Sequence, residues 1–190
     1  MKRLVCIVEG RGEVAAVPQL CVSVFQYLGV ADWSVDKAPI RQPRGSLVDE
    51  RIKSPRRPSR PEGIARAATL AMQRRADAAL VICDADDDCP ATWGPHALGA
   101  IPPPLPAAAV MASREYETWL LHDLSDAKGV ESKRGAKEAL RRLVPSYEPT
   151  THQLLLTRKL DVPRVRARSD SFDKLVRDLA RLCGVKPPKR

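Results

Sequence analysis

Aromatic residues are scarce in this 190-residue chain: Trp, Tyr and Phe make up only 4% of it. A hydrophobic core must therefore be built mostly from Leu, Val, Ala and Ile. No apolar run approaches the roughly 20 residues that a membrane-spanning helix needs. The run LVCIV near the N-terminus meets a charge at Glu9 and is too short for a secretory signal. We therefore expect a soluble, cytoplasmic protein with no membrane partner.

Cysteines are few and irregularly spaced. The chain has five of them, an odd number, and contains no C-x-x-C pair. Cys6 and Cys83 lie inside apolar runs, which predicts reduced and mostly buried thiols. Cys83, Cys89 and His96 could be drawn together as zinc ligands, but their spacing matches no usual zinc site. The cysteines thus indicate neither a disulfide framework nor a zinc centre.

Acidic residues are outnumbered by basic ones. Thirty-two Lys and Arg residues against 23 Asp and Glu residues give a formal net charge of +9. This balance favours a polyanionic partner such as nucleic acid, or an anionic surface. A soluble protein with Arg-rich helix faces would have the same balance, so the charge alone does not decide. With 44% apolar residues, the chain can bury one good core.

Apolar runs that end on carboxylates alternate with helical patterns. Residues 4–8, 78–83 and 107–112 are predicted to be buried strands, and WSVDKAPI favours a further one. This alternation is typical of an α/β fold with a mainly parallel sheet sandwiched between helices. We expect a core over residues 1–121 and a basic helical C-terminal region over 122–190. Helices are predicted at 14–28, 62–76, 114–124, 135–144, 151–160 and 172–183.

Two groups of carboxylates follow the first two clear strands. Glu9 and Glu13 lie in VEGRGE, and DADDD begins at Asp84. Because carboxyl ends of neighbouring parallel strands form one crevice, we expect Glu9 and Asp84 to meet at one sheet edge. Carboxylates this close repel one another unless a cation lies among them, and oxygen ligands suit Mg²⁺ or Mn²⁺. The alternative is an acidic surface turn, or a cluster that caps a helix beginning at PATWG.

These motifs resemble the toprim domain shared by topoisomerases, DnaG-type primases and OLD-family nucleases. In that domain a strand-terminal Glu and a later strand ending in D-x-D hold Mg²⁺ between them. The chain is most similar to a family of small stand-alone toprim-like proteins of unassigned function. The likeness covers nearly the whole chain, with the toprim core at about 1–121, and is carried by VEGRGE, DADDD, EYETW and RARSDSF.

The resemblance implies a Mg²⁺-dependent nuclease (or one using Mn²⁺) that hydrolyses phosphodiester bonds in DNA or RNA. By the same resemblance, it would work beside an ATPase partner of AAA type in defence against phage. The sequence leaves undecided whether the chain forms a homodimer. Glu9 would be a metal ligand or the general acid/base, and Asp84 and Asp86 would hold the metal. The further acidic candidates are Glu13 for a second metal, Asp88 as another ligand, and Glu115 and Glu117 in support.

Basic residues offer contacts for a phosphate backbone. A proline-rich basic loop is expected over residues 41–61, and Lys/Arg contacts of this kind give sequence-independent, salt-sensitive binding. A solvated loop without function would have the same composition. Arg11 could contact phosphate or weaken metal binding, and Arg168 precedes a helix start that could simply be capped. The nucleic-acid candidates are Arg11, Arg41, Arg44, Arg56, Arg57, Arg60 and Arg168.

Two other functional classes fit parts of the sequence. A non-catalytic basic adaptor could keep the toprim-like shell and bind nucleic acid or an ATPase. A receiver-like or phosphoryl-transfer domain also gathers carboxylates around Mg²⁺ at strand ends. That class needs a Lys after a late strand, and none follows AAAVMAS at the expected place.

Overall fold

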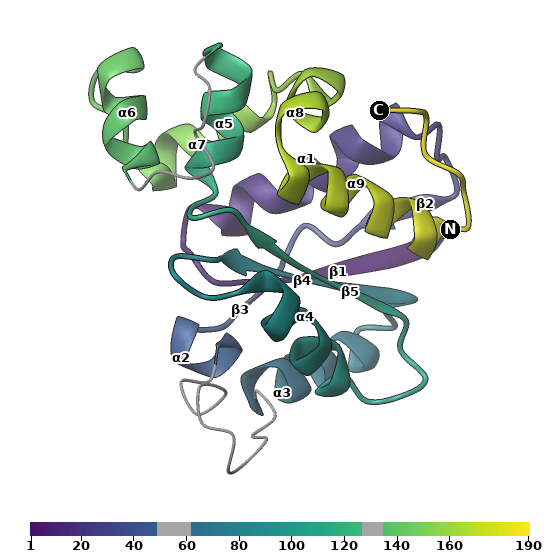
Figure 1. Cartoon of the computed structure of the whole chain (residues 1–190). Coiled ribbons are helices and arrows are strands. Elements are labelled where there is room, and N and C mark those ends of the chain that lie inside the picture. The colour runs from purple at the N-terminus through teal and green to yellow at the C-terminus, as the bar shows by residue number, and fades with distance from the viewer. Residues whose placement is uncertain (49–61, 127–134) are drawn as a thin grey trace.

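The computed structural model describes residues 1–48, 62–126 and 135–190, and shows an α/β fold (Figure 1). A parallel sheet with the strand order β2-β1-β4-β5 lies between two layers of helices, and β3 pairs with the end of β1. The predicted fold class, a mainly parallel sheet sandwiched between helices, is confirmed. The strands are β1 (Lys2–Val8), β2 (Trp33–Val35), β3 (Ile40–Arg41), β4 (Ala78–Asp84) and β5 (Ala107–Ala112).

The central strands read as continuous apolar runs because both sides of the sheet are covered. In β1, Leu4 and Cys6 pack into one buried cluster, whereas Val5 and Ile7 pack into the other. The same alternation continues in β4 and β5. Figure 1 shows α1 and α9 over one face of the sheet, with α3 and α4 over the opposite face.

The described residues contain more helices than the sequence analysis predicts. They are α1 (Glu13–Tyr27), α2 (Arg44–Leu47), α3 (Glu62–Gln73), α4 (Pro90–Gly99), α5 (Glu117–Leu124), α6 (Ala136–Leu143), α7 (Pro149–Thr157), α8 (Val162–Arg168) and α9 (Asp170–Cys183). In the part of the chain that the structure describes, no helix is long and apolar enough to cross a membrane.

Several boundaries differ from the prediction for identifiable reasons. The helix α3 ends before residue 76 because Arg75 adopts a left-handed conformation with φ 60°. The helix α4 was expected only under the alternative of a capping cluster before PATWG, because its prolines and glycines indicate a turn, although Pro90 is tolerated in a first helical turn. The loop expected from residue 41 begins in regular structure, since Arg41 belongs to β3 and α2 follows. The remainder of that loop lies outside the described residues.

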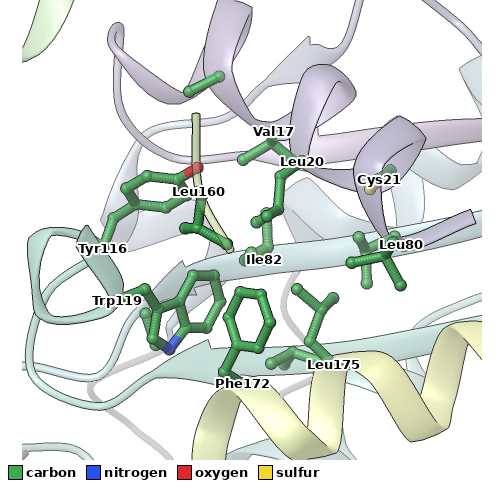
Figure 2. Packing of buried hydrophobic residues seen from close by; sticks show 14 of the residues in the cluster. Val17, Leu20, Cys21, Leu80, Ile82, Tyr116, Trp119, Leu160, Phe172 and Leu175 are labelled. Carbon is green, nitrogen blue, oxygen red and sulfur yellow. The ribbon is translucent and has the colours of Figure 1, made fainter. Parts of the chain in front are cut away.

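Three of the few aromatic residues, Tyr116, Trp119 and Phe172, pack together between the sheet and the C-terminal helices (Figure 2). The Trp119 ring lies 5.3 Å from that of Phe172 and 5.4 Å from that of Tyr116, measured between ring centroids. All three side chains are fully buried. They fill the layer where α5 and α9 meet the ends of β4 and β5, next to the edge at which the carboxylates were expected.

The helix α9 also covers the open side of β5. Lys174 Nζ donates to Ala109 O at 3.0 Å, and Arg181 Nη2 donates to Ala107 O at 2.9 Å. These two carbonyls alternate with the carbonyls of Pro106 and Ala112, which accept from the β4 side. Side chains of α9 thus occupy acceptors of a strand whose outer side has no neighbouring strand in the described sheet.

Candidate functional site

The carboxyl ends of β1 and β4 lie side by side because the two strands pair in parallel, with Ile7 opposite Val81. Just beyond this pair, β1 leads into Glu9 and β4 ends on Asp84. The strand register therefore brings the two sequence-predicted residues to the same edge of the sheet. Each approaches Arg44: its Nη1 lies 3.3 Å from Glu9 Oε2 and 2.9 Å from Asp84 O.

The turn between β1 and α1 is organised by its own second carboxylate. Glu13 Oε2 accepts hydrogen bonds from the main-chain N–H groups of Glu9 at 3.0 Å and Gly10 at 3.1 Å. Gly12 is required by packing, because a Cβ there would lie 2.2 Å from Gln153 Oε1 of α7. The glycines of VEGRGE therefore allow close backbone approach to Glu13 and to α7. The side chain of Glu13 is buried.

Burial raises the pKa of Glu9, Glu13 and Asp84 at this edge, and repulsion between carboxylates adds to the rise. Burial raises the pKa of Glu13 to about 7, against main-chain hydrogen bonds that lower it. Desolvation also raises the pKa of Asp84 well above its ordinary value, and the charges of Glu13, Glu117 and Glu9 add to this. Asp84 Oδ1 accepts from the Tyr116 main-chain N–H at 2.7 Å. Burial and mutual repulsion thus both disfavour the ionised forms of these inner carboxylates.

Glu117 is the most deeply buried of the predicted acidic residues, at 1% exposure. Its Oε1 accepts from the Tyr147 hydroxyl at 3.1 Å and from Gln153 Nε2 at 3.1 Å, and lies 3.8 Å from Lys137 Nζ. Glu115 is less buried and accepts from the Lys137 main-chain N–H at 3.2 Å. The contacts from α6 and α7 were missed, because no spacing in the sequence links that region to EYETW.

Arg44 supplies the positive charge of the outer part of the site. Besides Glu9, its guanidinium contacts Asp86 Oδ2 at 3.1 Å and Asp88 Oδ2 at 2.6 Å. Burial alone would lower the pKa of Arg44, but the surrounding carboxylates raise it above its ordinary value. Burial raises the pKa of Glu9, and the Arg44 charge opposes this rise. The sequence placed Arg44 among contacts for nucleic acid, whereas in the structure it binds the acidic cluster.

A second arginine lies at the outer rim of the DADDD turn. Arg114 Nη1 donates to Asp86 O and to Asp87 Oδ1, each at 2.7 Å. Asp86 and Arg114 both have left-handed backbones, with φ 46° and 64°. Between these turns lies a surface depression of about 220 Å³, lined by Ala85, Asp86, Asp87, Asp88, Pro90, Ser113 and Arg114. This hollow is the accessible surface beside the carboxylates.

The other predicted basic contacts fall in different places. Arg41 Nη1 donates to Glu9 O at 3.4 Å, so Arg41 borders the site, and Arg11 is exposed in the turn after β1. Arg168 Nη1 instead donates to His122 O at 2.9 Å, at the end of α5. The Ser169 hydroxyl caps α9, as the alternative reading of this region predicted. Three further arginines lie outside the described residues: Arg56, Arg57 and Arg60.

The residue types suit a hard divalent cation, but their arrangement is that of an ion-pair cluster. Glu9, Asp84, Asp86 and Asp88 supply the carboxylate oxygens that Mg²⁺ prefers. Burial raises the pKa of Glu9 and of Asp84, and a cation beside these carboxylates would favour their ionised forms. Across residues 1–48, 62–126 and 135–190, however, no three His, Cys, Asp or Glu side chains are grouped as a ready-made metal site. The carboxylate oxygens are therefore of the kind that binds such an ion, but the Arg44 guanidinium lies among them.

Comparison of the chain with protein-family models, with curated proteins and with solved structures found no match.

Proposed function

We propose that the chain is a Mg²⁺-dependent nuclease of the toprim type that hydrolyses phosphodiester bonds in DNA or RNA. The observation that carries this proposal is the meeting of Glu9 and Asp84 at adjacent strand ends, with the pKa of each raised. Structural carboxylates on a surface turn are normally solvated or paired. Partly buried carboxylates with raised pKa values at adjacent strand ends favour a functional site that takes up a cation.

Each residue has a role in this proposal. Glu9, Asp84, Asp86 and Asp88 would hold the ion, and Glu13 would support a second one. When bound, Mg²⁺ would supply electrostatic stabilisation of the charge that develops on the phosphate oxygens. Glu9 would accept or return a proton, since its side chain retains 20% exposure and its pKa lies above the ordinary value.

Substrate binding would use the basic residues around this edge. Arg41 and Arg114 border the carboxylates, and exposed Arg11 lies in the adjoining turn. Such contacts would hold the phosphate backbone without reading its sequence. The resemblance adds a cytoplasmic role in phage defence and an AAA-type ATPase partner that would choose the target.

The test is cleavage by the purified chain of supercoiled plasmid, single-stranded DNA and tRNA, with Mg²⁺ or Mn²⁺. We expect Glu9→Gln and Asp84→Asn each to lower the rate by about a hundredfold or more. Asp87→Asn is the matched control, because Asp87 is 59% exposed and pairs with Arg114 at the rim. Cleavage that survives in both inner variants would show that the site is wrongly placed. A chain inactive on every substrate with either ion would refute the nuclease proposal.

A basic adaptor without catalytic activity is the second candidate, and the position of Arg44 favours it. Three carboxylates of the cluster already have a counter-charge. Salt-sensitive binding of DNA or RNA, unchanged by EDTA and by Asp84→Asn, would identify the adaptor.

A further inference from the structure

Arg44 lies at the centre of an oxygen-lined position at the sheet edge. Nη1 contacts Glu9 Oε2, Asp86 Oδ2 and Asp84 O at 3.3, 3.1 and 2.9 Å. Nη2 contacts Asp88 Oδ2 at 2.6 Å and the main-chain oxygen of residue 85 at 3.3 Å. Both terminal nitrogens are therefore engaged, and every one of these partners is an oxygen.

The same oxygens are the ones that a hard cation would use. A divalent ion and a guanidinium are both cations, so their simultaneous presence among Glu9, Asp86 and Asp88 is opposed by charge and by space. We infer that Arg44 is an internal competitor of the divalent ion: it neutralises these carboxylates in the metal-free protein and withdraws when the ion binds. This inference rests on the proposed metal-dependent function and adds a control of metal affinity to it.

The surroundings of Arg44 favour withdrawal of the side chain over movement of its helix. The helix α2 is anchored by Leu47, which is fully buried and whose carbonyl accepts from Trp93 Nε1 at 2.9 Å. Gly63 of α3 also packs closely on Ser46. Arg44 itself retains 28% exposure, so its long side chain can turn towards solvent by changing rotamer.

The inner carboxylates are held by contacts that do not involve the Arg44 guanidinium. The recorded contact of Arg44 with Asp84 is to the main-chain oxygen, and the Asp84 carboxylate accepts from Tyr116 N. Glu13 hydrogen-bonds to its own turn. The ion would therefore exchange with the guanidinium of Arg44 while these contacts of Asp84 and Glu13 stay in place.

Mn²⁺ binding, measured by isothermal titration calorimetry, tests the inference with three proteins. We expect Arg44→Gln to bind Mn²⁺ at least about tenfold more tightly than the unaltered chain, because a charge-assisted competitor is removed. Arg114→Gln is the matched control: it removes the same charge at the rim, where Arg114 pairs with Asp87, and should change the affinity by less than about threefold.

The outcomes separate the inference from the function on which it rests. Equal Mn²⁺ affinity of the unaltered chain and Arg44→Gln would overturn the competitor role and leave the metal site standing. An equal gain in Arg114→Gln would also overturn it, since the effect would then be one of overall charge. No Mn²⁺ binding by either protein at millimolar concentrations would refute the metal-dependent function itself.

Thermal unfolding supplies a readout that remains informative for a weakened variant. In EDTA, Arg44→Gln should melt below the unaltered chain, because three carboxylates lose their partner. Saturating Mn²⁺ should raise its Tm by more than that of the unaltered chain. Arg44→Lys keeps the charge but loses the two-nitrogen fork, so its affinity should be intermediate. A smaller Mn²⁺-induced rise in both variants than in the unaltered chain would contradict the competition.

Discussion

Replacing Glu13 by glutamine should stabilise the metal-free protein at alkaline pH, although the change alters a buried residue with two hydrogen bonds. Glutamine keeps an oxygen that can accept from Glu9 N and Gly10 N, the two donors that Glu13 Oε2 serves. What it loses is the ability to ionise. Because burial raises the pKa of Glu13 to about 7, ionising this side chain in the folded state is unfavourable.

The sign and size of the effect follow from that pKa. The folded state holds the Glu13 proton more tightly than the unfolded state, in which the pKa is near 4.5. The resulting stability is fully present below pH 4.5 and is lost as the pH rises through 7. A rise of the pKa from 4.5 to about 7 is equivalent to about 3 kcal/mol. Removing the Glu13 charge also relieves Asp84, whose pKa it helps to raise.

Urea unfolding between pH 4.5 and pH 8.5 in EDTA measures this difference. Glu13→Gln should have an unfolding free energy close to that of the unaltered chain at pH 4.5 and exceed it by up to about 3 kcal/mol at pH 8.5. Glu138→Gln, on the exposed surface of α6, is the matched control and should shift stability by less than about 0.5 kcal/mol throughout. A gap between Glu13→Gln and the unaltered chain that does not widen with pH would refute the account of the inner carboxylates.

One further change tests the packing beside the site, and another tests a buried ion pair between α8 and α9. Gly12→Ala should lower the unfolding free energy by about 1–3 kcal/mol, because its Cβ would meet Gln153. Gly45→Ala is the control and should not lower the unfolding free energy, because open space surrounds that position. Equal losses of the two variants in urea unfolding would contradict this prediction. Asp173→Asn should lower the unfolding free energy by about 3–5 kcal/mol in the same measurement, since it leaves the buried Arg166 charge without the carboxylate 2.8 Å away. A loss below about 1 kcal/mol would contradict that reasoning.

The sheet and the position of its acidic edge could be predicted because each depends on short-range pattern. The apolar runs before Glu9 and Asp84 mark strands buried on both faces, and a parallel arrangement then places both residues at one edge. The helix α4 could not be predicted in this way. Pro95 and two glycines lie within it, and it is held by burial of Trp93 rather than by helix propensity.

The partners of the site residues were beyond the reach of the sequence for a different reason. Tyr147 and Gln153 reach Glu117 only because α7 packs against the start of α1. Arg44 lies in a basic, proline-rich stretch whose composition indicates solvent exposure. Its pairing with Asp88 depends on the path from β3 into α2, and no local pattern encodes that path.

The occupied carbonyls of β5 restrict how this protein can associate with other chains. A peptide or a second copy that joined this side as an extra strand would have to displace Lys174 and Arg181 from Ala109 and Ala107. Strand addition at β5 therefore competes with the protein's own C-terminal helix. A homodimer on this side would instead be formed by side chains of α9, and its interface would be a helix surface on which basic and acidic side chains are already paired.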